Sequence, residues 1–210
     1  RDGDHDPAIG RRIADGKYII ESLIGSGAAG AVYRATHREL RRTVAIKILH
    51  PHYQQDPQFM TSFRGEALAA SQLDHPNVMR VLDFDQEADG LIYIVMEYLS
   101  GRTLQSLLDE ERRLPMDRAV EIMIQVCAAL SIAHDHGIIH RDIKPENIML
   151  VPSRNDEGTT FELVKVCDFG IAALQNPRAE DAELAATEHV IAGTPEYMSP
   201  EQARGTEVDA

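Results

Sequence analysis

The segment IIHRDIKPENIML brings together side chains that could act on one substrate. One of its two acids, three bases and an amide form the group of interest, between two apolar runs. They are His140, Arg141, Asp142, Lys144 and Asn147. A polar loop between two strands is the simpler interpretation. A catalytic loop is the other, because apolar runs buried at both ends would hold the loop while its polar groups faced a substrate.

A second acid strengthens the catalytic interpretation. Asp168 lies in the sequence DFG, 26 residues after Asp142. Mg²⁺ prefers oxygen ligands and commonly keeps phosphate oxygens among them, and Asn147 with Asp168 would supply an amide and a carboxylate oxygen. Asp142 would then orient a substrate hydroxyl and accept its proton. Lys144 would neutralise charge on a transferring phosphoryl group.

A glycine-rich stretch, GSGAAGAV, contains Gly25, Gly27 and Gly30. Glycine has no Cβ, so its backbone can approach phosphate oxygens closely. Strand-like sequence lies on both sides of the stretch, which differs from the strand-then-helix dinucleotide motif. We interpret it as a flap over a triphosphate. A plain β-turn is the alternative.

Lys47 interrupts the apolar run VAIKIL. A buried ammonium needs a partner, because burying an unpaired charge is costly. Glu66 is the natural counter-ion, since it lies in residues 57–73, whose apolar spacing is helical. Such a pair would hold the amine toward the α- and β-phosphates. An outward-facing lysine on an alternating strand is the alternative.

The composition limits the class of protein. The chain has 210 residues, 43% of them hydrophobic and 26% charged, which is typical of a globular protein. Its net charge of −13 argues against a general nucleic-acid binder, whose surface would be basic. Cys127 and Cys167 show neither a disulfide framework nor metal-site spacing, which favours a reducing, cytoplasmic setting. No apolar run approaches the about 18 residues of a membrane span.

The pattern of elements changes near residue 100. Strand-like runs separated by turn residues precede it, at 18–25, 29–37, 43–50, 78–85 and 91–99. The last two are predicted to form a hairpin with an Asp-Gly turn. Two helices follow, at 103–111 with Thr103 as N-cap and at 115–137. We expect short strands at 138–140, 148–151 and 163–169.

These motifs appear in one order: GSGAAGAV, VAIK, HRDIKPEN, DFG and GTPEYMSPEQ. In that order the chain resembles a eukaryotic-type protein kinase of the bacterial Ser/Thr branch. The resemblance implies an α+β, two-lobed fold. Residues 17–97 would form a five-stranded antiparallel sheet plus a helix, 97–101 a hinge, and 102–210 part of a mainly helical lobe. Residues 1–16 are expected to be a polar lead-in.

The resemblance also implies ATP and Mg²⁺ as cofactors, with Asn147 and Asp168 binding the metal and Asp142, Lys144, Lys47 and Glu66 in catalysis. The implied nucleotide-binding residues are Gly25, Gly27, Gly30, Val32, Ala45, Lys47, Glu97, Leu99 and Met149. Met96 would be the gatekeeper. Ordinary core packing is the other interpretation of Met96 and Met149.

Regulatory roles follow from the same resemblance. Arg141, beside Asp142, would bind a phosphate on the activation loop, and Thr187 is the first candidate to carry it. A solvated loop threonine is the alternative for Thr187. Thr194 would bond near Asp142 and Lys144, and His140 would stack on Phe169 as a structural residue.

Two departures from the family are visible. The polar insert PSRNDEGTTFE is longer than the usual tight hairpin, and we expect it to bulge from the surface without disturbing the site. The family also continues past residue 210 into further helices, and an arginine of that region would pair with Glu201. We therefore expect the chain to be a piece of a longer polypeptide, poorly active alone.

The leading hypothesis is an ATP-dependent kinase that phosphorylates Ser or Thr of proteins, with self-association for autophosphorylation. We expect no nucleic-acid partner and no membrane segment in the chain, and an anchor beyond residue 210 stays open. A nucleotide-binding pseudokinase or scaffold is the alternative. A small-molecule kinase is disfavoured, because GTPEYMSPEQ resembles a platform for peptide substrates.

Overall fold

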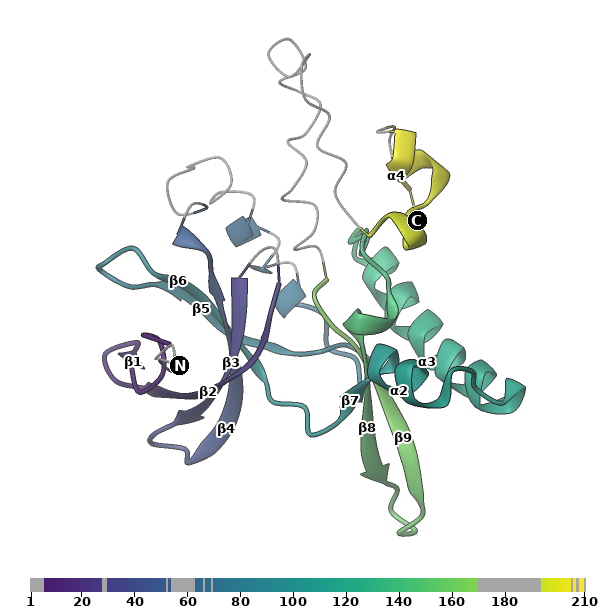
Figure 1. Ribbon diagram of the computed structural model, residues 1–210, viewed down its shortest axis with the longest axis horizontal. Helices are drawn as coiled ribbons and strands as arrows, with labels where there is room; N and C mark the ends of the chain where they lie inside the picture. The colour runs from purple at the N-terminus through teal and green to yellow at the C-terminus, as the bar shows by residue number, and fades with distance from the viewer. Residues whose placement is uncertain are drawn as a thin grey trace, which may run out of the picture. The chain divides into compact units, whose positions relative to one another are not determined.

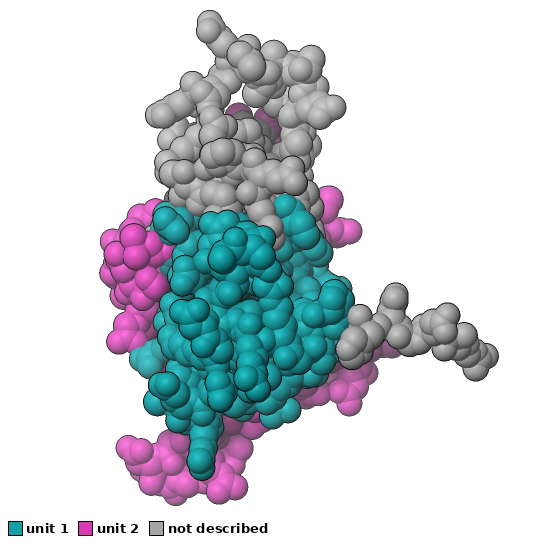
Figure 2. Space-filling model, turned by 90° about the vertical axis from the view of Figure 1, so that its left-hand side faces the viewer, with its two compact units in different colours: residues 1–67, 80–99 teal, residues 68–79, 100–210 magenta. Residues whose placement is uncertain are grey.

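The computed structural model describes residues 6–27, 30–51, 53, 63–65, 67–68, 70–169, 194–204, 206 and 208–209. The chain divides into two compact units. The first comprises residues 1–67 and 80–99, and the second comprises 68–79 and 100–210 (Figure 2).

The first unit is built on an antiparallel sheet with the order β1-β2-β3-β4-β6-β5 (Figure 1). Its strands are β1 (Arg12–Ile13), β2 (Tyr18–Ser26), β3 (Gly30–His37), β4 (Arg42–Leu49), β5 (Val81–Gln86) and β6 (Ile92–Glu97). The five expected strands are present. β1 is a sixth, inside the expected polar lead-in, and it pairs with β2 because Ile13 is fully buried in the core.

Side-chain alternation divides this sheet into two faces. Successive residues of a strand point to opposite faces, so directly paired residues share one. One face carries the core cluster, which consists of Ile13, Tyr18, Ile20, Tyr33, Ala35, Val44, Ile46, Tyr93 and Val95. The other face therefore carries Lys47 and the residues paired with it, Val32 and Ile94.

The predicted hairpin of β5 and β6 turns at Gly90, whose φ of 91° is accessible to glycine at little cost. The backbone N–H of Gly90 donates to the carbonyl of Glu87 at 2.9 Å, and the N–H of Glu87 donates to the carbonyl of Leu91 at 2.8 Å. Within the helix expected at 57–73, the described residues 63–65, 67–68 and 70–71 are helical.

The second unit contains helices α2 (Leu104–Glu111), α3 (Met116–Asp135) and α4 (Pro200–Arg204), with the 3₁₀ turns η2 (Pro145–Asn147) and η5 (Pro195–Tyr197). α2 begins as predicted, since Thr103 Oγ1 accepts a hydrogen bond from the N–H of Ser106 at 3.0 Å. None of the described helices is both long and apolar enough to cross a membrane.

A three-stranded antiparallel sheet completes this unit, in the order β7-β8-β9. Its strands are β7 (Arg102–Thr103), β8 (Ile148–Arg154) and β9 (Thr160–Val166). Most of the polar insert lies within the ladder, which runs out to the pair Arg154 and Thr160. The insert therefore lengthens the hairpin, and residues 154–161 are exposed at its far end. The strand expected at 138–140 is wrong: these residues are not in a strand.

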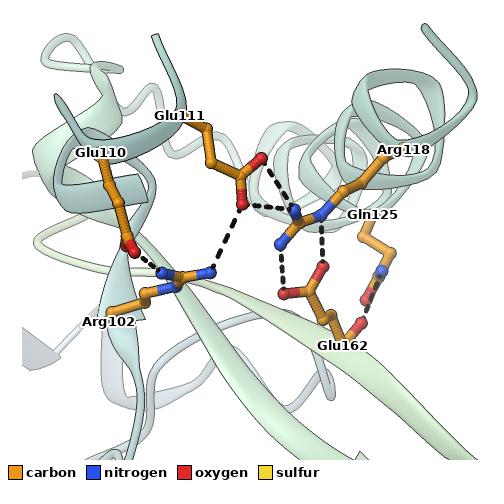
Figure 3. A network of polar contacts seen from close by, with 6 residues as sticks. All are labelled: Arg102, Glu110, Glu111, Arg118, Gln125 and Glu162. Atoms are coloured by element: carbon orange, nitrogen blue, oxygen red, sulfur yellow. Dashed lines mark hydrogen bonds and ion pairs between the residues drawn. The ribbon is translucent and has the colours of Figure 1, made fainter. Parts of the chain in front are cut away.

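Charged and amide side chains join α2 and α3 to β7 and β9, the edge strands of the three-stranded sheet (Figure 3). The guanidinium of Arg118, on α3, donates to both carboxylate oxygens of Glu162, on β9, at 2.8 and 2.9 Å. It also contacts Glu111 at the end of α2, and Glu111 lies 3.9 Å from Arg102 on β7. Bidentate arginine–carboxylate pairs fix geometry as well as charge. This network holds α3 against β9.

Candidate active site

The β8–β9 hairpin brings the two expected metal ligands to the same end of one sheet. Asn147 directly precedes β8, and Cys167 and Asp168 directly follow β9. Ile148 is paired with Val166, and the N–H of Cys167 donates to the carbonyl of Asn147 at 2.8 Å. Residues 20 apart in sequence thus become neighbours because the strands are antiparallel.

Asp142 is held by two of the residues predicted with it. Its Oδ2 lies 2.9 Å from Lys144 Nζ and accepts a hydrogen bond from Asn147 Nδ2 at 3.1 Å. Asn147 Nδ2 also donates to the backbone carbonyl of Asp142, at 2.8 Å. Lys144 Nζ continues to Thr194, donating to Oγ1 at 2.9 Å. The loop 140–147 therefore holds its acid in place through its own side chains.

His140 is a buried connector, with 1% of its surface exposed. Its Nδ1 accepts from the N–H of Asp142 at 3.2 Å, so its Nε2 carries the proton that bonds the carbonyl of Cys167 at 2.8 Å. Burial lowers the pKa of the imidazole, which favours the neutral ring. The ring also packs on Phe169, with 4.8 Å between centroids. These contacts suit a structural histidine.

Two residues of this region adopt left-handed backbone conformations that side chains disfavour. The φ of Arg141 is 62° and the φ of Asp168 is 59°. Such conformations persist where surrounding contacts hold them, and they cluster at functional sites. Here they immediately precede Asp142 and Phe169.

A partly buried amide network joins α3 to β9. Gln125, on α3, accepts hydrogen bonds at Oε1 from Asn77 Nδ2 and from the N–H of Val164, both at 2.9 Å. Its Nε2 donates to the carbonyl of Glu162 at 3.0 Å. The backbone of Asn77 also accepts from the N–H of Val166, at 2.8 Å. Gln125 and Asn77 could not be predicted from the sequence, because their partners lie far away in the chain.

In the first unit, the expected nucleotide-binding side chains share one face of the sheet. Val32 is paired with both Gly25 and Lys47, and Ala45 is two residues from Lys47 on the same strand. Met96, paired with Ala45, lies on this face as well. Lys47 is only 6% exposed. This face of the unit therefore carries a buried amine next to small and apolar side chains.

The three glycines of the motif have different surroundings. A Cβ on Gly30 would lie 2.1 Å from the carbonyl oxygen of Ile48, so glycine is required there for β3 and β4 to pair. A Cβ on Gly25 or Gly27 would meet nothing within 4 Å. The N–H of Gly27 donates to the carbonyl of Gly30 at 2.9 Å, which joins the residue directly after β2 to the first residue of β3. Gly25 and Gly27 thus keep open space above the backbone.

Comparison with known proteins decides the family. The family model described as "Protein kinase domain" matches residues 18–210. The chain belongs to the protein kinase family. It is 46% identical over 209 residues to serine/threonine-protein kinase pkn3 of Myxococcus xanthus, covering 100% of this chain and 37% of that protein. It is 42% identical over 197 residues to serine/threonine-protein kinase PrkC of Bacillus subtilis, covering 94% of this chain and 28% of that protein.

Solved kinase structures confirm the predicted fold. The crystal structure of the Mycobacterium tuberculosis PknI kinase domain is similar with a TM-score of 0.72 and 28% sequence identity, covering 97% of this chain and 71% of that chain. The bacterial Ser/Thr kinase resemblance expected from the motifs is therefore confirmed. The chain spans 37% of the pkn3 relative and 28% of the PrkC relative.

Asn147 offers an oxygen that could hold Mg²⁺. Asn147 is 8% exposed, and its Nδ2 faces two acceptors of Asp142, so its Oδ1 points elsewhere. This Oδ1 accepts no hydrogen bond from the described residues. A buried acceptor needs a partner, and an amide oxygen is a suitable ligand for a hard cation. The described part of the chain holds no cluster of three or more His, Cys, Asp or Glu arranged for a metal.

The remaining expected residues are Glu97, Leu99, Met149, Glu66 and Thr187. Glu97 is paired with Val44 at the end of β6, and its backbone N–H donates to the carbonyl of Arg80 at 3.0 Å. Leu99 is partly buried and ends the first unit, and Met149 is partly buried on β8 of the second. Glu66 and Thr187 lie outside the described residues.

Proposed function

We propose that this chain carries the catalytic machinery for transfer of the γ-phosphoryl group of ATP to serine or threonine hydroxyls of proteins. The observation that carries the proposal is the environment of Asp142. Its side chain is 16% exposed, and Lys144 and Asn147 both contact the same oxygen, Oδ2. Among the described residues nothing bonds Oδ1, which leaves that oxygen for a substrate hydroxyl.

In this mechanism Asp142 orients the hydroxyl through Oδ1 and accepts its proton. The hydroxyl oxygen forms a bond to the γ-phosphorus, the bond from that phosphorus to the β–γ bridging oxygen breaks, and ADP leaves. Lys144 is near enough to Asp142 to stabilise charge on the transferred group. Kinase catalysis rests on such positioning and charge neutralisation, without a covalent intermediate.

Asn147 and Asp168 are the proposed Mg²⁺ ligands, since the hairpin sets them at the same end of the β8–β9 sheet. When bound, Mg²⁺ would neutralise phosphate charge. Asn147 would contribute Oδ1 while its Nδ2 keeps Asp142 in place, so one side chain would serve both the metal and the acid. Two protein ligands are enough when phosphate oxygens complete the shell.

The nucleotide is proposed to lie on the face of the first unit that carries Val32, Ala45 and Lys47. Gly25 and Gly27 would allow close approach of the phosphates. Lys47 would bind the α- and β-phosphates with Glu66 as its counter-ion.

The backbone of Glu97 and Leu99 would bind the adenine edge, and Met149 would contact the ring. Gly30 is proposed to act by allowing β3 and β4 to pair.

Regulation and partners complete the proposal. Arg141 is exposed, so its guanidinium can bind an activation-loop phosphate, for which Thr187 is the candidate. Protein substrates, and a second copy of the chain during autophosphorylation, would supply the hydroxyl. Both cysteines are free thiols, as suits a cytoplasmic kinase.

The test is incorporation of labelled phosphate from γ-labelled ATP with Mg²⁺, into the protein itself and into generic protein substrates. It is run on this chain and on the complete gene product. We expect label on serine or threonine. The rate of label incorporation should fall at least about 100-fold in Asp142→Asn. Asp156→Asn, in the exposed turn of the β8–β9 hairpin, is the matched control and should label normally.

A complete gene product that binds ATP but transfers no phosphate to any substrate would overturn the proposal and favour a scaffold. A complete gene product and an Asp142→Asn variant with equal activity would also overturn it, because the activity would then not use this acid.

A further inference from the structure

Gln202 connects the last described helix to the catalytic loop. It lies on α4, and its side-chain Nε2 donates a hydrogen bond to the backbone carbonyl of Arg141, 61 residues earlier. Arg141 directly precedes Asp142. A side chain outside the predicted site therefore contacts the backbone on which the proposed base is mounted.

The Gln202 side chain contacts Ser199 at its other end. The N–H of Ser199 donates to Gln202 Oε1, and the N–H of Gln202 donates to Ser199 Oγ, both at 3.2 Å. Serine followed three residues later by glutamine is a capping box, and Pro200 occupies the first helical position. The partners also determine the amide orientation. A backbone N–H can only donate and a carbonyl can only accept, so Oε1 must face Ser199 and Nε2 must face Arg141.

The peptide that links Arg141 to Asp142 is bonded on both sides. Its carbonyl accepts from Gln202, and its N–H donates to Nδ1 of His140 at 3.2 Å. With both polar groups bonded, this peptide plane has little freedom to rotate. The φ of 62° at Arg141 is disfavoured for a residue with a Cβ, so the plane needs such contacts to keep its orientation.

A second contact joins the same two segments on the far side of Asp142. Lys144 Nζ donates to Thr194 Oγ1 at 2.9 Å. Residues 194–202 therefore touch the loop both before and after the acid, through Gln202 and Thr194. The Thr194 contact uses a side chain of the loop, whereas the Gln202 contact acts on its backbone.

We propose that Gln202 is a positioning residue for Asp142: its amide holds the Arg141–Asp142 peptide so that the carboxylate faces the substrate hydroxyl. It touches neither ATP nor substrate in this role. The inference rests on the proposed function for its effect on rate, whereas its effect on the loop backbone is independent of that function.

Gln202→Glu is the sharpest test. Glutamate has the same shape and keeps the oxygen that accepts from Ser199, so the capping box remains. It loses the donor to Arg141 and sets a carboxylate oxygen against a carbonyl oxygen. We expect kcat to fall about tenfold with the KM for ATP changed less than about twofold, since only the acid is displaced. In Gln202→Ala, which also loses the donor, kcat should fall at least as far.

Two matched controls separate the effect of losing the Gln202 Nε2 hydrogen bond from the effects of the added charge and of losing the helix cap. Gln86→Glu makes the same replacement at an exposed glutamine whose Nε2 donates to the carbonyl of Gly90, and it should leave kcat unchanged. Ser199→Ala removes the cap but keeps the Gln202 donor. It should therefore lower kcat less than Gln202→Glu does.

Amide hydrogen exchange supplies a measurement that needs no activity. In Gln202→Glu, the peptide that covers 138–147 should exchange roughly three- to tenfold faster than in the wild type, while α3 exchanges as before. If exchange at 138–147 is faster in Gln202→Glu but the protein never transfers phosphate, the positioning role is supported and only the proposed function is contradicted. If Gln202→Glu and Gln202→Ala both match the wild type in kcat and in exchange at 138–147, the positioning role is wrong.

Discussion

The imidazole of His140 lies 2.8 Å, at Nε2, from the carbonyl oxygen of Cys167, the residue directly before Asp168. The same ring accepts at Nδ1 from the N–H of Asp142. One neutral histidine thus joins the backbone of the proposed base to the backbone of a proposed metal ligand. The two acids are 26 residues apart in sequence, and this ring makes their positions depend on each other.

Replacing His140 with phenylalanine should cost about 1–3 kcal/mol in free energy of unfolding. The aromatic packing on Phe169 would remain, but the carbonyl of Cys167 and the N–H of Asp142 would lose their buried partner. Urea unfolding measures the change. His136→Phe is the matched control, because His136 is an exposed histidine that also bonds a backbone carbonyl, that of Ile132. Equal losses for the two variants would contradict the buried linking role.

The three motif glycines should respond differently to alanine. Gly30→Ala should destabilise the chain by about 1–3 kcal/mol, because the new Cβ would collide with the carbonyl of Ile48 and push β3 from β4. Gly25→Ala and Gly27→Ala should change stability by less than about 1 kcal/mol, since their Cβ atoms would meet open space. These two should instead raise the KM for ATP. Urea unfolding and ATP kinetics measured on all three variants check this division.

A uniform response would be informative. Three variants with similar stability and similar KM values would mean that the glycine stretch acts only as a turn, and the separate role given to Gly30 would be wrong.

Local patterns were sufficient for much of the fold. On β4 the core residues Val44 and Ile46 alternate with Ala45 and Lys47 on the other face. Gly90 marks the turn before β6, and Thr103 caps α2. β1 was missed because a strand of two residues has no periodicity, so nothing in the sequence distinguishes Ile13 from a loop residue. Residues 138–140 have a strand-like composition but are not in a strand, since apolar character predicts burial and not pairing.

The candidate site also contains residues that could be predicted from the sequence and residues that could not. Asp142, Lys144 and Asn147 could be predicted because they are neighbours in sequence and their chemistry is recognisable together. Gln125 and Gln202 could not, because an amide gives no signal of a partner 61 residues away. Gly30 was predicted as a phosphate-binding glycine, whereas its steric role depends on the register of β3 and β4, which composition does not reveal.

Stability should fall between pH 10 and pH 12 partly through Tyr33. Burial first, and then the hydrogen bond to Asp6, raise the pKa of this phenol from 10.0 to about 12. Below pH 10 both folded and unfolded chains keep the proton, so its contribution is fully present. Above pH 10 the unfolded chain loses the proton first, and folding becomes less favourable as pH rises.

Tyr33→Phe tests this assignment, because phenylalanine keeps the ring in the core and cannot ionise. The variant should be less stable than the wild type at pH 8, where it lacks the bond to Asp6, and the difference should shrink toward pH 12. Tyr197→Phe, at an exposed position, is the control. Parallel curves of unfolding free energy against pH for wild type and Tyr33→Phe would refute the assignment.

Lys144 and Thr194 should behave as one unit in catalysis. Lys144 Nζ reaches Asp142 and Thr194 at 2.9 Å each. Removing Thr194 therefore loosens Lys144, whereas removing Lys144 leaves Thr194 without a role beside the acid. We expect Lys144→Ala to lower kcat about 100-fold and Thr194→Val, which keeps the shape but not the hydroxyl, about tenfold. The double variant should fall no further than Lys144→Ala, because residues of one network are not additive. A double variant about 1000-fold slower than wild type would mean that the two act independently, and that the 2.9 Å contact with Thr194 does not serve to hold Lys144.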